Sequence, residues 1–95
     1  MDIELRTTRG EIEDFKNSIL WKDMKAELGK WLKMCRIEQD GIVQDAEENN
    51  PSTATVLLHI GDINGRKKAI NFILEMPDMF LSILDYKLED KLNDS

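Results

Sequence analysis

The sequence is poor in the residues that carry covalent, metal and membrane chemistry. It contains one cysteine and one histidine among 95 residues, too few for a disulfide framework or a structural zinc site. No stretch approaches the roughly 18 consecutive apolar residues that a membrane-spanning helix needs. The first five residues lack the basic and apolar regions of a secretory signal. We therefore expect no cofactor, no metal, no secretory signal and no membrane partner.

Basic residues are also in the minority. The chain has 13 lysines and arginines against 19 aspartates and glutamates, which gives a formal net charge of −6. A general nucleic-acid-binding domain needs a basic face, so we expect no such binding. Hydrophobic residues make up 41% of the chain. A chain of this length forms one domain at most, with a thin core.

The strongest positive signal is a helical one in residues 18–39, which contain no proline and one glycine. Apolar side chains recur there at spacings of three and four, so they share one helix face. They are Trp21, Met24, Leu28, Trp31 and Cys35. Asn17 and Ser18 are residue types that cap the start of a helix. We predict a long helix over residues 18–39, preceded by a short helix over residues 11–16 that begins at Thr7-Thr8 or Gly10.

The middle of the chain predicts a break. The pair Asp40-Gly41 is typical of a helix stop, and residues 38–50 contain five acids and no base. Asn50 stands before Pro51, which disfavours the helical conformation at Asn50. We expect an acidic connector over residues 40–52. The alternative is a helix that frays through residues 42–47 and ends before Asn50.

A second long helix is predicted over residues 53–75, started by Ser52 or Thr53. The alternative is a buried strand over residues 53–60, which are rich in β-branched side chains. No second strand-like run exists to pair with it, and an isolated strand is unstable. Pro77 suits the first turn of a new helix, so we predict a last helix over residues 77–91. The expected architecture is an all-α domain, residues 1–95, of three to four helices around an antiparallel helical hairpin.

Two features point to close packing or to an interface. The default interpretation of the stripe with Trp21, Leu28 and Trp31 is a core face. A stripe this heavy can also exceed what two partner helices cover, and leftover apolar surface usually marks an interface. In a helix, Gly61, Gly65 and Ala69 form one column of small residues. The column would allow another helix backbone to pack closely against it, either from the helix that carries Gly29 or from a second subunit. Alternatively, Gly61 or Gly65 ends the helix and forms a turn.

The only basic cluster is Arg66, Lys67 and Lys68. At the start of a helix, these side chains and the free backbone N–H groups could hold an anion. The alternative is a solvated face that pairs with the acidic connector. His59 has no nucleophile at a suitable spacing, and Cys35 lies on the apolar stripe, where a cysteine behaves as a small hydrophobe. No catalytic residue is predicted.

Two blocks of residues resemble small uncharacterised proteins of tailed bacteriophages. The first block is Phe15-x-x-Ser18-x-x-Trp21-Lys22-Asp23, followed by Glu27-Leu28-x-x-Trp31. The second is Gly65-Arg66-x-x-Ala69-Ile70-x-Phe72-Ile73-Leu74-x-Met76-Pro77, with Met76 where the group has leucine. The resemblance spans about residues 12–80. It implies a phage origin, often from genes near those for packaging and head assembly, and it implies no catalytic residues.

Two functions from different classes follow as hypotheses. The first is a non-enzymatic phage protein that acts through protein contacts in virion assembly or structure, as a homo-oligomer or on a phage structural protein. The second is a small phage inhibitor that binds a host factor or sequesters a phosphorylated defence messenger. Both place the protein in the virion or in the cytoplasm of the infected host cell.

Overall fold

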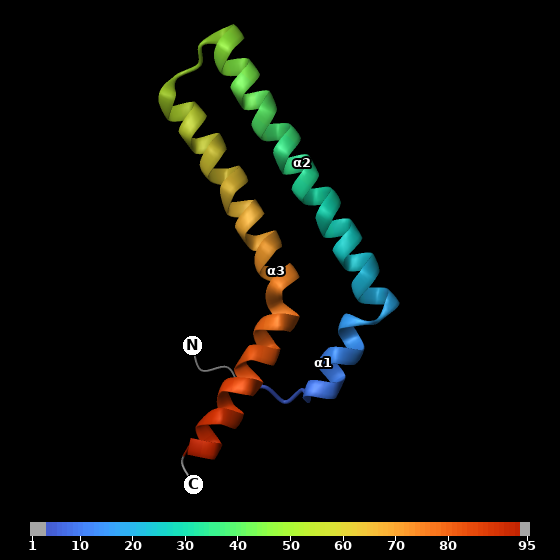
Figure 1. Cartoon of the computed structure of the whole chain (residues 1–95). Helices are drawn as coiled ribbons and strands as arrows, with labels where there is room; N and C mark the ends of the chain where they lie inside the picture. Colours follow the sequence, from blue (N-terminus) through green and yellow to red (C-terminus); the bar gives the residue numbers. More distant parts are fainter. Residues whose placement is uncertain (1–3, 94–95) are drawn as a thin grey trace.

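A computed structural model describes residues 4–93 of the chain, and within that range it contains three helices and no strand (Figure 1). The helices are α1 (Arg9–Lys16), α2 (Ile19–Asn49) and α3 (Thr53–Asn93). The prediction of an all-α fold is confirmed. The strand alternative for residues 53–60 is wrong, because this segment is the start of α3. The expectation about the N-terminus concerns in part residues 1–3, which lie outside the described residues.

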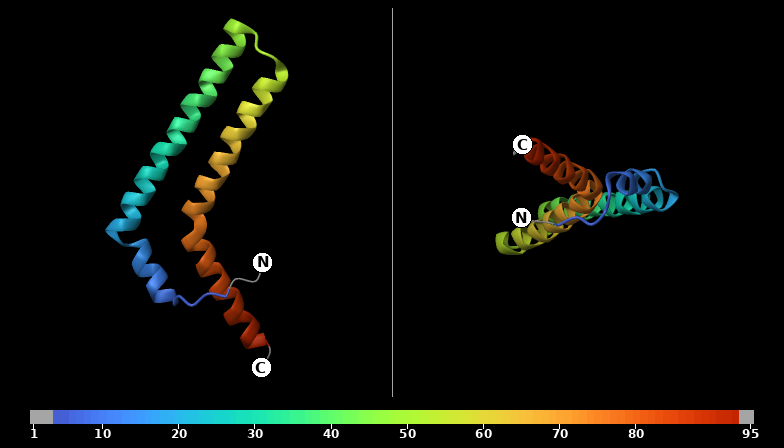
Figure 2. Two further views of the ribbon diagram at one scale, coloured as in Figure 1. Left: turned by 180° about the vertical axis from the view of Figure 1, so that it is seen from behind. Right: turned by 90° about the horizontal axis from the view of Figure 1, so that it is seen from below.

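The molecule is a long, thin pair of helices rather than a rounded bundle. Helices α2 and α3 lie side by side and run in opposite directions, and α1 packs on α3 at the end away from the connection (Figures 1 and 2). The molecule measures 65 × 32 × 15 Å, and its radius of gyration is 19.4 Å. A compact domain of 95 residues has a radius of gyration of about 12 Å. Much of each helix is therefore left uncovered.

The seam between α2 and α3 follows a repeat of seven residues. The first row consists of Trp21, Leu28, Cys35 and Ile42 on α2, and Val56, Ile63, Ile70 and Pro77 on α3, of which all but Ile42 and Val56 are buried. Four of them, Leu28, Cys35, Ile63 and Ile70, form one buried cluster. A seven-residue repeat keeps one row of side chains facing the partner helix along its whole length. The core is therefore a single narrow row.

A second row of side chains beside the first is only half buried. It consists of Leu32, Gln39 and Ala46 on α2, and Ile60, Lys67 and Leu74 on α3. Lys67 interrupts the apolar pattern at this row, and its long aliphatic stem can lie along the seam while the ammonium group reaches water. None of the described polar or charged side chains is classed as buried.

Side chains that accept backbone N–H groups define where the helices begin. The Thr8 hydroxyl accepts from the backbone of Glu11 at 3.2 Å, and the Glu11 carboxylate accepts in return from the backbone N–H of Thr8, which forms a capping box. The Ser18 hydroxyl accepts from the backbone of Trp21 at 3.1 Å. Ser52 does the same for the backbone of Thr55 at 3.2 Å. These caps agree with the residue types predicted to start the helices.

The predicted acidic connector over residues 40–52 is wrong, because α2 runs without a break to Asn49. A glycine inside a helix costs about 1 kcal/mol relative to alanine. At Gly41 that cost is offset because the neighbouring Ile42 packs on the core cluster. The connection is reduced to residues 50–52. Asn50 takes the left-handed conformation, with φ 47° and ψ 55°, which asparagine tolerates and which avoids the clash with the following proline.

The predicted boundary at Pro77 is also wrong, because the helices expected over residues 53–75 and 77–91 form one helix, α3. Pro77 removes one backbone hydrogen bond and bends a helix, and the axis of α3 changes direction near this point (Figure 1). The helix continues because Pro77 is buried on the seam. Ion pairs from α1 also hold the segment beyond the bend: Lys16 with Asp78, and Arg9 with Asp85.

Candidate functional site

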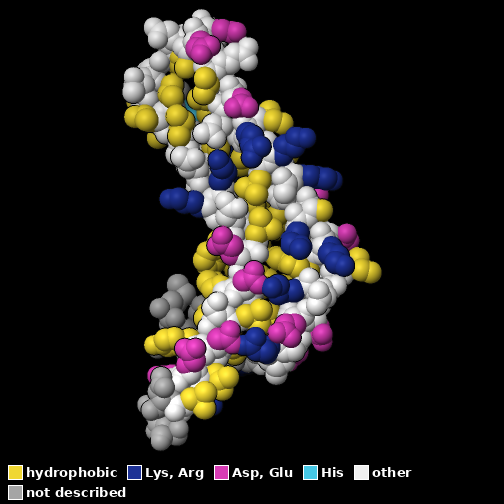
Figure 3. Space-filling view, in the orientation of Figure 1, with side chains coloured by type: hydrophobic (Ala, Val, Ile, Leu, Met, Phe, Trp, Pro, Cys, Tyr) yellow, Lys and Arg dark blue, Asp and Glu magenta, His cyan; other side chains and the backbone are white. Residues whose placement is uncertain are grey.

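The large apolar side chains outside the seam are strongly exposed. On α2, the exposed fraction is 48% for Trp31 and 58% for Met34, and on α3 it is 52% for Phe72. The default interpretation of Trp31 as a core residue is therefore wrong, whereas Trp21 and Leu28 are buried as predicted. Apolar side chains lie along the line between the two helices, with lysines and arginines beside them (Figure 3).

Two hollows on the molecule are lined mainly by apolar side chains. One, of about 450 Å³, lies between α2 and α3, has Cys35 and Ile70 among its lining residues, and is bordered by Trp31, Met34, Ala69 and Ile73. The other, of about 390 Å³, lies where α1, α2 and α3 meet and is lined by Phe15, Met24, Ile73, Met76 and Phe80, among others. Because Ile73 lines both, the hollows adjoin. We call the joint surface the apolar groove and define it by Phe15, Met24, Trp31, Met34, Ile73 and Phe80.

The walls of the apolar groove are held by local contacts. The indole N–H of Trp31 donates to the Glu27 carboxylate, one turn earlier on α2, at 3.1 Å. This bond satisfies the polar end of the ring, so the indole can present its apolar face without an unpaired donor. At the α1 end, the ring of Phe15 packs against that of Trp21, with their centroids 5.2 Å apart.

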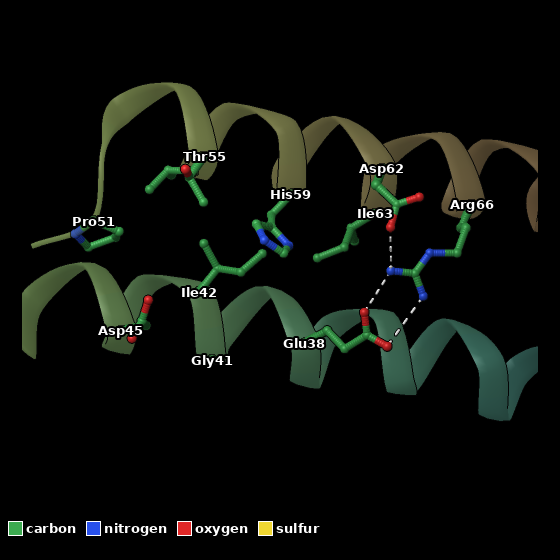
Figure 4. Close-up of a pocket in the computed structure, with 11 residues that line it drawn as sticks. Glu38, Gly41, Ile42, Asp45, Pro51, Thr55, His59, Asp62, Ile63 and Arg66 are labelled. Carbon is green, nitrogen blue, oxygen red and sulfur yellow. Dashed lines mark hydrogen bonds and ion pairs between the residues drawn. The ribbon is translucent and has the colours of Figure 1, made fainter. Parts of the chain in front are cut away.

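A charged cluster marks the end of the apolar groove nearer the connection (Figure 4). The Arg66 guanidinium on α3 donates to both carboxylate oxygens of Glu38 on α2, at 2.6 and 3.3 Å. It also donates to Asp62, one turn earlier on α3, at 3.1 Å. The hydrogen bond from Arg66 lowers the pKa of Glu38 below its ordinary value, and the same bond raises the pKa of Arg66. Arg66 is thus already paired with two carboxylates of its own chain.

The structure does not bring the three basic residues of the predicted anion site together. Successive residues on a helix point about 100° apart, and Arg66 is taken up by Glu38 and Asp62. Lys67 is half buried in the second row of the seam, and Lys68 is exposed. They lie in the middle of α3, so no free backbone N–H groups of a helix start are near them. The pairing of Arg66 with Glu38 instead fits the alternative of a solvated face that meets the acidic segment.

The small-residue column faces open space. Gly61 and Gly65 lie inside α3 with ordinary helical backbones, so the turn alternative is wrong. A Cβ atom built on Gly29, Gly61 or Gly65 would have no described atom outside its own helical turn within 4 Å. The column therefore does not pack on the helix that carries Gly29. The third member, Ala69, is exposed and lines the apolar groove.

The residues with catalytic potential lie apart from one another. His59 is exposed and lines a third hollow of about 490 Å³ near the connection, together with Asp45 and Asp62 (Figure 4). This hollow meets the apolar groove at Glu38 and Arg66, which line both. Cys35 is buried in the core cluster. Among the described residues, no group of three or more His, Cys, Asp or Glu side chains is placed to hold a metal ion.

Sequence reasoning missed most of the apolar groove. The predicted stripe includes Met24 and Trp31 as core positions, and no prediction assigns Ile73 or Phe80 to an interface. A seven-residue register would have found them. Met24 and Trp31 lie one heptad apart beside the buried row of α2, and Ile73 and Phe80 lie one heptad apart beside that of α3.

Comparisons of the whole chain with protein-family models, with curated proteins and with solved structures return no match. In the part of the chain that the structure describes, no helix has the length and apolar character needed to cross a membrane.

Proposed function

We propose that the protein is a non-enzymatic bacteriophage protein that acts through protein–protein contacts in the assembly or structure of the virion. The apolar groove carries the contact part of this proposal. Its hollows expose methionine and aromatic side chains, residue types that are enriched where proteins bind one another. The phage setting comes from the resemblance of the blocks around Trp21 and Gly65. The protein would then be found in the virion or in the cytoplasm of the infected host cell.

The shape of the chain supports a role in contact rather than in chemistry. A catalytic site needs a nucleophile or base with an orienting partner in a concave pocket. Here, His59 and Cys35 lie in different places, one exposed and one buried. A long pair of helices with one apolar groove is instead suited to lie along another helical surface.

The second hypothesis is a small phage inhibitor that binds a host factor or sequesters a phosphorylated messenger. No described contact identifies a host factor, and the messenger form has no observation in its favour. Its three basic residues diverge, and Arg66 is neutralised by Glu38 and Asp62. We therefore propose only the first function.

The test is mass spectrometry of purified phage particles and of assembly intermediates from infected cells. We expect the 11.0 kDa chain in one of these fractions. Phage carrying Trp31→Lys should lose the chain from that fraction, because the lysine places a charge in the apolar groove. Val43→Lys is the matched control, because Val43 lies on the same helix, is 56% exposed and lines none of the hollows described above. Absence of the unmodified chain from particles and from all intermediates would contradict the proposal.

A further inference from the structure

The surface area of the chain is larger than that of a compact folded monomer of its mass. The chain exposes 7683 Å², whereas a compact monomer of 11.0 kDa exposes about 5,600 Å². The excess is about 2,000 Å² per chain. A stable interface of standard size removes about 800 Å² from each partner, and obligate dimers remove more. The excess is therefore sufficient for one such interface.

The apolar groove can both receive and supply apolar side chains. Its hollows have a buried floor at Cys35 and Ile70, and its walls project Trp31 and Met34, which are about half exposed. In a pair related by a two-fold axis, the same patch of each copy packs on that of the other. Each copy would then offer the exposed wall of its groove to the hollow of its partner.

The charge pattern of α2 indicates how two copies would be oriented. Residues 22–36 carry five basic and two acidic side chains, whereas residues 38–48 carry five acidic side chains and no basic one. Two copies with their connections at the same end would place the acidic segments together, and like charges repel. Two copies with their connections at opposite ends avoid this repulsion and bring each acidic segment toward the basic segment of the other.

We propose that the apolar groove is a self-association surface, where a second copy of this chain packs on a two-fold axis with the two α2–α3 connections at opposite ends. This proposal rests on the proposed function and extends it, because it names a second copy of the chain as the partner that binds the apolar groove. In the dimer, helices α2 and α3 of both copies form a four-helix arrangement. Each α2–α3 pair keeps its own buried row, and the two apolar grooves form a second apolar layer between the pairs.

The test is sedimentation equilibrium of the full chain at micromolar concentrations, which measures mass without regard to shape. We expect twice the mass of one chain. Trp31→Lys should raise the dimer dissociation constant by about 30-fold or more, because a tryptophan at an interface centre is often worth 2 kcal/mol or more. Met34→Lys should also raise it, because it places a charge in the apolar groove. Phe72→Lys should leave it unchanged, because Phe72 is 52% exposed, lines none of the hollows described above and lies outside both charged segments of α2. Because all three side chains are exposed, circular dichroism should show unchanged helix content.

Three results would overturn the proposal. The first is a monomer at every concentration, which would assign the apolar groove to a different protein. The second is a dimer that persists in Trp31→Lys and Met34→Lys. The third is a dimer that Phe72→Lys disrupts equally. None of these results contradicts the proposed function, which is tested separately by mass spectrometry of phage particles and assembly intermediates.

The orientation has its own test. A spin label is attached at Gln44→Cys in a Cys35→Ala background, close to the connection, and the distance between the two labels of a dimer is measured. Connections at opposite ends place the labels farther apart than the 32 Å width of one molecule. A separation well below that width would mean that the acidic segments meet, and the proposed orientation would be wrong.

Discussion

Replacement of the two glycines inside α3 should stabilise the protein. Gly61 and Gly65 have ordinary helical backbones, and a Cβ atom at either position meets no described atom outside its own helical turn within 4 Å. Alanine is therefore tolerated without a clash. A glycine-to-alanine change in a helix interior is worth about 0.8–1 kcal/mol, largely because glycine has more conformational freedom to lose on folding.

The expected size follows from these values. Gly61→Ala and Gly65→Ala should each raise the free energy of unfolding by about 1 kcal/mol, and the thermal midpoint by about 4–8 °C. Thermal and urea denaturation, followed by circular dichroism at one fixed protein concentration, measure the change. Ala26→Gly, at an exposed site inside α2, should lower stability by a similar amount. Even Gly65→Leu should not overpack, because the space around it is open.

A loss of stability in either alanine variant would refute this reasoning. It would mean that another backbone lies against the column of Gly61, Gly65 and Ala69 in solution. The close approach predicted from the sequence would then be made by a second subunit over this face, and the self-association surface would be larger than the apolar groove.

Three further predictions concern the core, a cap and the charged cluster. Leu28→Ala should lower the free energy of unfolding by about 2–5 kcal/mol in urea denaturation, since Leu28 lies in the buried row; a cost below 1 kcal/mol would mean that the seam is loosely packed. Ser18→Ala should cost about 1 kcal/mol in the same assay, because it removes the acceptor for the backbone N–H of Trp21, whereas Ser18→Asp should retain most of the stability. The pKa of Glu38 is lowered from 4.5 by Arg66, so the unfolded chain binds a proton more readily there, and the stabilisation is present above pH 4.5 and lost as the pH falls below it. Glu38→Gln should remove this part of the acid sensitivity in denaturation curves measured from pH 7 to pH 3, and an unchanged pH profile would contradict the role of the pair.

The helices could be predicted because their causes are local. The spacing of Trp21, Leu28 and Cys35 defines the buried face of α2, and Ser18 starts that helix through a hydrogen bond three residues ahead. The same holds for the capping box of Thr8 and Glu11. Asn50 before Pro51 ends α2 because the clash involves adjacent residues only. Each of these signals lies within one or two helical turns.

The breaks predicted at Gly41 and Pro77 failed because their outcome is not local. Each residue weakens a helix by an amount that packing can offset, and packing depends on residues far away in the sequence. Ile42 meets the cluster built on Ile63, and Pro77 is itself buried on the seam.

The same division holds for the candidate site. The sequence by itself determined that the chain is helical and acidic and that its apolar stripe is large, since these properties depend on composition and on short-range spacing. Only the tertiary structure decided which apolar side chains remain outside. Two helices can bury just one narrow row each, so Trp21 is enclosed while Trp31, ten residues along the same stripe, is left at the surface. The tertiary structure also decided which residue pairs with Arg66. Its partner Glu38 is 28 residues away in the sequence and becomes its neighbour only when α2 and α3 pack together.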